Sequence, residues 1–244
     1  MIAALLDDAR ARVADIDLAP TGLILPHAGY IYSGSTAALG YALLERLRGR
    51  ITRVVLLGPC HRVYTDGLAL PDAGAFETPL GSVPVLEVPA ELRRALPQLR
   101  VSALVHAEEH SLEVHLPFLQ AVLGDFALVP VVVGEASPEQ VAELLQAVWG
   151  GEETLVVVSS DLSHYLPYEA ARERDRATCR AILALQPNLD PREACGAAPI
   201  NGLLLEARRR GLAIEQVDLR NSGDTAGDRD HVVGYAAFAL HERR

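Results

Sequence analysis

Lysine is absent from this sequence, so arginine supplies all of its fixed positive charge. A chain without lysine cannot form a Schiff base with a carbonyl substrate, and it cannot build the phosphate-binding P-loop, whose motif requires a lysine. The net charge is −10. A chain this acidic, with no large basic cluster, is a poor candidate for binding nucleic acid, so we expect no nucleic-acid partner.

Cysteines are few, and long apolar runs are lacking. The three cysteines, Cys60, Cys179 and Cys195, are too few and too scattered for a disulfide framework, which indicates a reducing compartment. No apolar run approaches the roughly 20 residues of a membrane span. The segment Met1–Arg10 has acidic residues early and no basic stretch before an apolar one, unlike a secretory signal. Together these features predict a cytoplasmic protein with no membrane association.

The composition is sufficient for a sizeable core, because 50% of the 244 residues are hydrophobic. Short apolar runs alternate with helical segments along the chain, without an internal repeat or a low-complexity linker. This alternation predicts one α/β domain that spans residues 1–244. The expected strands cover residues 22–25, 54–57, 67–70, 126–133, 154–158, 213–219 and 232–240, and the expected helices cover residues 1–15, 35–47, 89–96, 137–148, 169–185 and 200–210.

Three of the expected strands are each followed by a loop that carries a histidine. The pairs are strand 22–25 with His27, strand 54–57 with His61, and strand 154–158 with His164. These strands are short apolar runs, typical of strands that are buried on both faces. Ligands of open α/β sheets bind outside the carboxyl ends of the strands. If the three strands are parallel neighbours, the three histidines converge on one point.

A pair of histidines at adjacent strand ends predicts a metal site. His27 and His61 offer imidazole nitrogens, which suit iron, copper or zinc, and such a metal needs a third protein ligand and an open position. Residues 190–193 have the pattern of a helix start, which predicts that Cys195 lies in the first turns of a helix. The helix dipole would there favour the thiolate form of Cys195. The alternative is that Cys195 is an ordinary buried thiol. Cys60 is disfavoured as a ligand because it is adjacent to His61, and the side chains of adjacent residues in an extended loop point apart. The candidates for the third ligand are Cys195, His164, Asp161 and Glu113.

The loop after strand 154–158 is also a candidate for acid–base chemistry. Asp161 and His164 lie three residues apart in the sequence SSDLSH. A histidine titrates near neutral pH and therefore suits a general acid or base. We expect His164 to fill this role with Asp161 as its orienting partner, whereas the simpler alternative is that Asp161 caps a turn.

Polar residues are densest in residues 106–115. On a helix, His106, His110 and Glu113 would lie on one face, although Pro117 must begin or bend that helix. The spacing of the histidines does not match the HExxH motif of zinc proteases. The residues predicted to contact substrate or to support the metal ligands are Tyr30, His110 and Glu113.

Several of these segments resemble, in order, the motifs of the Memo family, the protein B component of the AmmeMemoRadiSam system. The resemblance extends from about residue 21 to residue 240, nearly the whole chain. The segments are PHAGYIYSG, LLGPCH, FETPLGSVPV, EEHSLEVHLPFL, SSDLSHY and CGAAPINGLL.

The resemblance implies a fold related to the class III extradiol dioxygenases, with a central mixed β-sheet flanked by helices and a metal site at the strand ends. It implies that His27 and His61 are metal ligands. It also implies that Cys195 occupies the place where the dioxygenases have a carboxylate ligand. His164 matches their acid–base histidine, with Asp161 beside it. A thiolate in place of a carboxylate shifts the metal preference toward copper(I), zinc or thiolate-ligated iron.

The functional hypothesis is a metal-binding redox protein, with iron(II) or copper as the cofactor and zinc as a further candidate. Its chemistry is expected to be that of a metal-dependent oxidoreductase related to the dioxygenases. Two alternatives are a non-catalytic module that binds a metal or a phosphopeptide, and a zinc-dependent hydrolase. The ligand is expected to be a small molecule or a peptide. The resemblance also implies a radical SAM protein and the AmmeMemoRadiSam component A protein as partners.

Overall fold

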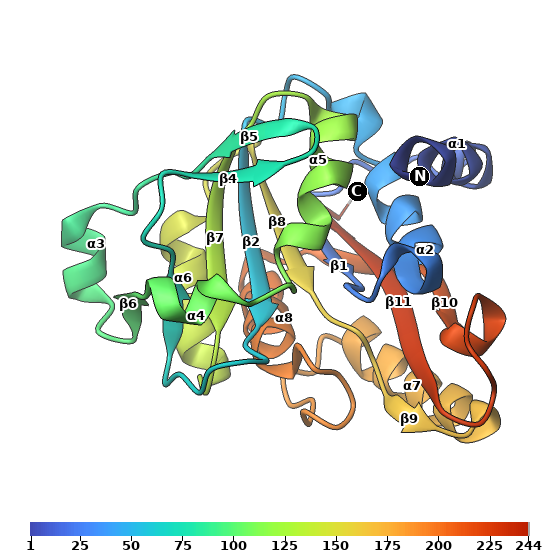
Figure 1. Ribbon diagram of the computed structural model, residues 1–244. Coiled ribbons are helices and arrows are strands. Elements are labelled where there is room, and N and C mark those ends of the chain that lie inside the picture. Colours follow the sequence, from blue (N-terminus) through green and yellow to red (C-terminus); the bar gives the residue numbers. More distant parts are fainter. Residues whose placement is uncertain (244) are drawn as a thin grey trace.

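A mixed β-sheet runs through the middle of the molecule, with helices on both of its faces (Figure 1). The computed structural model describes residues 1–243, and within them the sheet has nine strands. Their order is β10-β11-β1-β8-β2-β7-β3-β6, with β9 paired to β11. The strands are β1 (Gly22–Leu25), β2 (Arg53–Pro59), β3 (Leu68–Leu70), β6 (Leu99–Val101), β7 (Ala127–Val133), β8 (Thr154–Ser159), β9 (His164–Leu166), β10 (Ala213–Asn221) and β11 (Val232–His241).

The four central strands, β1, β8, β2 and β7, are parallel to one another. The outer strands are mixed, since β11 is antiparallel to β1 and β3 is antiparallel to β7. A separate two-stranded hairpin is formed by β4 (Ala75–Thr78) and β5 (Gly81–Pro84). The predicted α/β class is therefore confirmed, as is the mixed sheet flanked by helices.

The register of the central strands decides where the site lies. Leu25 of β1 pairs with Ser159 of β8, and Leu57 of β2 pairs with Val158 of β8. The chain therefore leaves β1, β8 and β2 at the same edge of the sheet. This confirms that the three strands that precede His27, His61 and His164 are parallel neighbours.

Both faces of the central strands are buried, as continuous apolar runs of parallel strands predict. Alternate residues of β2 and β8 belong to two different hydrophobic clusters, since successive side chains of a strand point to opposite faces. In β2, for example, Val55 and Leu57 pack on one side of the sheet and Val54 and Leu56 on the other. The sheet is thus held between two hydrophobic cores. The edge at which the chain leaves β1, β8 and β2 is therefore fixed from both sides.

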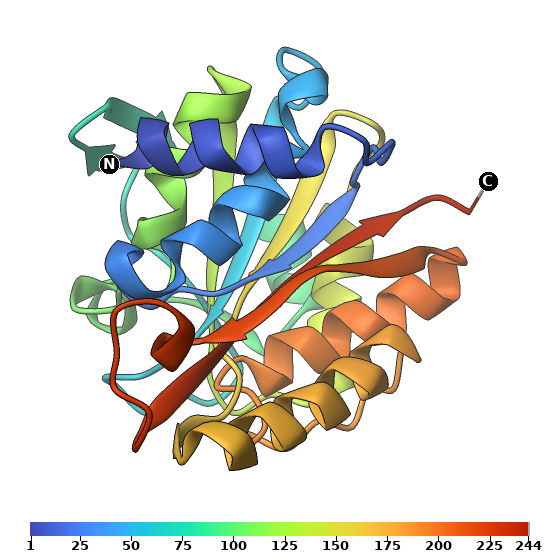
Figure 2. The same ribbon diagram turned by 90° about the vertical axis from the view of Figure 1, so that its right-hand side faces the viewer.

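The helices form two outer layers. Figure 2 shows α1 and α2 against one face of the sheet and α7 and α8 against the other. Among residues 1–243, none of the helices combines the length and the hydrophobicity that crossing a bilayer requires. The helices are α1 (Ile2–Val13), α2 (Tyr30–Ala42), α3 (Ala90–Ala95), α4 (Ala103–Ala107), α5 (Leu116–Leu123), α6 (Pro138–Val148), α7 (Tyr168–Leu183) and α8 (Ala197–Arg210), with 3₁₀ turns η1 (Glu45–Leu47), η2 (Glu113–His115) and η3 (Ser222–Asp224).

The start of α2 differs from the expectation. The sequence predicted a helix from residue 35, whereas α2 already begins at Tyr30. Gly29 is the N-cap residue, and the hydroxyl of Ser33 donates to the carbonyl of Ala28 (2.8 Å). The loop after β1 is therefore only four residues long, so His27 is held close to the sheet.

The predicted helix over residues 106–115 was wrong. Helix α4 ends at Ala107, and the chain then turns before η2 and α5. The carboxylate of Glu109 accepts the backbone N–H groups of His110 and Ser111, each at 3.0 Å, and so replaces helical hydrogen bonds. Pro117 lies in the first turn of α5, where a proline is tolerated.

The prediction of a short helix that contains Cys195 was also wrong. Residues 190–193 form a turn that is closed by the carboxylates of Asp190 and Glu193, and α8 begins only at Ala197. Cys195 therefore precedes the helix. Its backbone N–H donates to the carbonyl of Asp161 (3.2 Å), which fastens this turn to the loop after β8.

One buried carboxylate makes a testable contribution to stability. Asp175 of α7 is 1% exposed and accepts the backbone N–H of Ser163 (3.0 Å). Burial raises the pKa of Asp175 to about 6, although hydrogen bonds from Ser163 lower it in part. Between about pH 4 and pH 6 the folded protein thus keeps a proton that the unfolded chain has released, so this group's contribution to the free energy of unfolding falls as the pH rises.

We expect Asp175→Asn to be more stable than the wild type at pH 7 by up to about 3 kcal/mol, with a difference close to zero at pH 4. The asparagine retains an acceptor for the Ser163 N–H but cannot ionise. Urea unfolding of both proteins at pH 4 and pH 7 measures the difference. An equal difference at the two pH values would show that Asp175 does not titrate in this range.

Candidate metal centre

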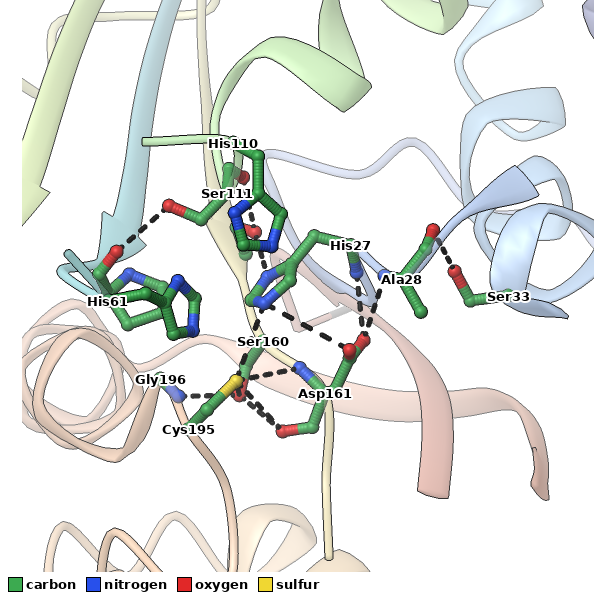
Figure 3. Close-up of polar contacts among 12 residues, drawn as sticks. His27, Ala28, Ser33, His61, His110, Ser111, Ser160, Asp161, Cys195 and Gly196 are labelled. Atoms are coloured by element: carbon green, nitrogen blue, oxygen red, sulfur yellow. Dashed lines mark hydrogen bonds and ion pairs between the residues drawn. The ribbon is translucent and has the colours of Figure 1, made fainter. Parts of the chain in front are cut away.

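Three imidazoles come together at the loop edge of the central strands (Figure 3). His27 follows β1, His61 follows β2, and His110 lies in the turn between α4 and η2. Their ring centroids are 5.2 Å (His27–His61), 5.7 Å (His27–His110) and 5.0 Å (His61–His110) apart. One nitrogen of each lies within 4.8 Å of the others. This three-histidine cluster has the composition of a metal-binding site.

His27 is buried and oriented by a serine. Its Nδ1 lies 2.6 Å from the hydroxyl of Ser159, and its backbone N–H donates to the carboxylate of Asp161 (2.9 Å). The Ser159 hydroxyl in turn donates to the carbonyl of Ser111 (2.6 Å). Burial, followed by the nearby His61, lowers the pKa of His27 to about 3. The ring is therefore neutral at pH 7, which is the form that binds metals.

His61 is held by a carboxylate that the sequence analysis overlooked. Its Nδ1 lies 2.9 Å from Glu109 Oε1, and its backbone N–H donates to Glu109 Oε2 (2.6 Å). Burial alone would raise the pKa of Glu109, but hydrogen bonds from His61 and Ser111 outweigh it and lower the pKa to about 2. Glu108 and Glu109 are adjacent in sequence, and only the fold shows that Glu109 is buried and Glu108 exposed.

Cys195 lies next to the imidazole of His27. Its Sγ is 3.5 Å from His27 Nε2 and accepts the backbone N–H of Asp161 (3.3 Å). Burial, followed by the charge of Asp161, raises the pKa of the thiol to about 12. The expected thiolate is therefore wrong, because burial and the charge of Asp161 favour the protonated thiol. At neutral pH the sulfur keeps its proton, which a metal ion would have to displace. Its role as a ligand stays a prediction.

Asp161 and His164 do not form the expected pair. The buried carboxylate of Asp161 accepts the backbone N–H groups of His27 (2.9 Å) and Ala28 (3.3 Å). His164 Nδ1 lies 2.8 Å from the carbonyl of Leu162, and a carbonyl only accepts, so Nδ1 carries the proton. The orienting partner of His164 is therefore a backbone carbonyl. The proposed acid–base role of His164 would involve Nε2.

Tyr30 and Glu113 lie at a different cavity. The Tyr30 hydroxyl donates to the carbonyl of Val114 (2.9 Å). Both residues line a cavity of about 310 Å³ whose lining includes Pro117 but none of the three clustered histidines. Of the three residues predicted to contact substrate or support the ligands, only His110 lies among the imidazoles.

A second cavity, of about 390 Å³, reaches the site itself. His61 and Cys195 both line it, together with Arg62 and Pro199. The thiol of Cys60 also lines it, but this thiol donates to the carbonyl of Val63 (2.7 Å). The cavity gives a small molecule access to one side of the imidazole cluster.

The donor set fits a transition-metal ion. It offers imidazole nitrogens and a thiol, the ligand types that iron, copper and zinc accept. Two of the imidazoles have their Nδ1 atoms engaged by Ser159 and Glu109, as is usual for histidines that ligate metals.

Fold and site together define an α/β protein with a histidine-rich centre at the carboxyl edge of its parallel strands. The family model described as Memo-like protein matches residues 4–239. The MEMO1 family protein Mbar_A1422 of Methanosarcina barkeri is 36% identical over 235 residues, which cover 90% of this chain and 86% of that protein. A MEMO1 family protein of Thermotoga neapolitana is 36% identical over 236 residues, which cover 91% and 83%. The chain belongs to the Memo family.

A solved structure shares the fold. The uncharacterized protein JW3007 from Escherichia coli K12 matches with a TM-score of 0.53 over 90% of this chain and 99% of that one. The two sequences are only 14% identical. The likeness therefore concerns the arrangement of helices and strands alone.

The geometry predicts different metal contents for two histidine variants. We expect His164→Ala to retain the metal content of the wild type, because His164 lies outside the three-histidine cluster. His61→Ala should lose most of the metal. Elemental analysis after anaerobic purification measures both. Loss of metal from His164→Ala would instead identify His164 as a ligand.

Proposed function

We propose that this Memo family protein binds iron or copper through His27, His61 and Cys195 and carries out redox chemistry on a small molecule. Three observations support the proposal. Nitrogen atoms of His27 and His61 lie within 4.8 Å of each other, Cys195 Sγ lies 3.5 Å from His27 Nε2, and both His61 and Cys195 line the cavity of about 390 Å³. A bound iron or copper ion supplies electron transfer and an open coordination position.

The surrounding residues are suited to this role. His27 and His61 are held by their Nδ1 atoms, so both present Nε2 to a metal. His164 has Nε2 available for proton transfer, because Nδ1 donates to a backbone carbonyl. Asp161 accepts two backbone N–H groups and fixes the loop that carries His27.

A zinc-dependent hydrolase is the second candidate. The specific observation that favours it is His110, because a site of three imidazoles is a known donor set for catalytic zinc. In that case Cys195 would lie beside the site without ligating.

A cysteine variant distinguishes the two donor sets. We expect Cys195→Ala to reduce the iron and copper content of purified protein at least tenfold if the thiolate is a ligand, because the site then loses one of three donors. Elemental analysis gives the content, and Cys179→Ala is the matched control, since Cys179 is buried in the core on α7. An unchanged metal content in Cys195→Ala would contradict the proposed ligand set.

Oxygen consumption tests the redox chemistry. We expect metal-loaded protein to consume oxygen with members of a panel of catechols, because the proposed site has an open position beside a cavity. An oxygen electrode measures the rate, with His61→Ala as the control for free metal. Hydrolysis of ester or phosphate substrates by the zinc form, without oxygen consumption, would support the hydrolase instead.

A further inference from the structure

The turn formed by residues 109–111 contacts both imidazoles of the proposed ligand set. Glu109 reaches His61 directly, with Oε1 2.9 Å from Nδ1. Ser111 reaches the other imidazole through one intermediate, because its carbonyl accepts the hydroxyl of Ser159, which lies 2.6 Å from His27 Nδ1. A single short turn therefore controls the Nδ1 atoms of two histidines that are 34 residues apart in the sequence.

These contacts determine where the ring protons lie. The carbonyl of Ser111 only accepts, so the single hydroxyl proton of Ser159 is committed to it. Ser159 must then accept a hydrogen bond from the N–H at Nδ1 of His27. An ionised carboxylate also only accepts, so Nδ1 of His61 carries a proton as well. In its neutral form, each ring then has its lone pair on Nε2.

The turn is anchored firmly enough to impose this arrangement. Glu109, Ser111 and Ser159 are 7%, 0% and 0% exposed. The Ser111 hydroxyl donates to the carbonyl of Pro59 (2.9 Å) at the end of β2. The Glu109 carboxylate also accepts the backbone N–H groups of the other two residues of the turn, His110 and Ser111. Little freedom remains for either contact with the imidazoles to shift.

We propose that Glu109 and Ser159 are positioning residues, organised by the turn at residues 109–111, that fix His27 and His61 as Nδ1–H tautomers so that Nε2 binds the metal. This inference rests on the proposed metal-binding function. Neither residue ligates the metal. Outer partners of this kind raise the metal affinity of the ligands that they orient by about 10–100-fold.

The tautomers can be observed without any metal. In protein labelled with ¹⁵N-histidine, two-bond nitrogen–proton NMR spectra should show both His27 and His61 as Nδ1–H tautomers. Glu109→Gln should convert His61 to a mixture of tautomers, since it leaves one acceptor oxygen for four N–H groups, and Ser159→Ala should affect His27 alone. An Nε2–H tautomer of either histidine in the wild type would overturn the inference.

Metal affinity provides the second measurement. Titration of chelator-treated protein with Zn²⁺ should give a Kd about 10–100-fold higher for Glu109→Gln and for Ser159→Ala than for the wild type. The matched controls are Glu108→Gln, an exposed neighbour, and Ser163→Ala, a buried serine after β8. Both controls should bind like the wild type, and thermal unfolding should confirm that all variants are folded.

The outcomes separate the two proposals. Wild-type protein that fails to bind Zn²⁺, iron and copper would overturn the proposed function and the positioning role together. Wild-type binding with an unchanged Kd in both Glu109→Gln and Ser159→Ala would overturn the positioning role alone. A weakening in the two variants that the controls reproduce equally would also overturn it, because the effect would then be general.

Discussion

The site depends on one constraint, which is the parallel pairing of β1 with one edge of β8 and of β2 with the other edge. Each strand is buried on both faces, so its register is fixed by two cores at once. A slip of one residue would turn every apolar side chain of a strand to the other face. The loops that follow the strands therefore leave the sheet at fixed points. The imidazoles of His27 and His61 meet there, and hydrogen bonds to Asp161 and Glu109 hold the loops that carry them.

The electrostatics of this edge favour a cation. Two carboxylates, Glu109 and Asp161, are buried there, and each is stabilised by backbone N–H groups rather than by arginine. The imidazole of His27 is kept neutral by burial, so it does not compensate their charge. Buried charges are costly unless they are paired or coordinate a metal. A divalent ion at the imidazoles would compensate the negative charge that hydrogen bonds from backbone N–H groups and from the His61 imidazole now support.

The seven strands that the sequence predicted are all present, because short apolar runs bounded by turn residues favour buried strands, whereas the three-residue strands β6 and β9 were missed. The sequence also identified His27 and His61, since both follow such runs directly. It missed Glu109, because burial of one of two adjacent glutamates depends on contacts with a loop 48 residues away. It misplaced Cys195 for a related reason. The capping residues before it close a turn, and tertiary hydrogen bonds to the β8 loop then prevent an early helix start.

The two histidines that we propose as ligands differ in their access to solvent, and this gives the site a direction. The side chain of His27 is 3% exposed, whereas that of His61 is 28% exposed. The cavity of about 390 Å³ is lined by His61 and Cys195 but not by His27. A ligand that enters through this cavity therefore meets His61 and the thiol first, and His27 closes the site from behind. Because Ser159 and Asp161 occupy the buried side, a metal held by the proposed ligands would be reached by a small molecule from the side of the cavity.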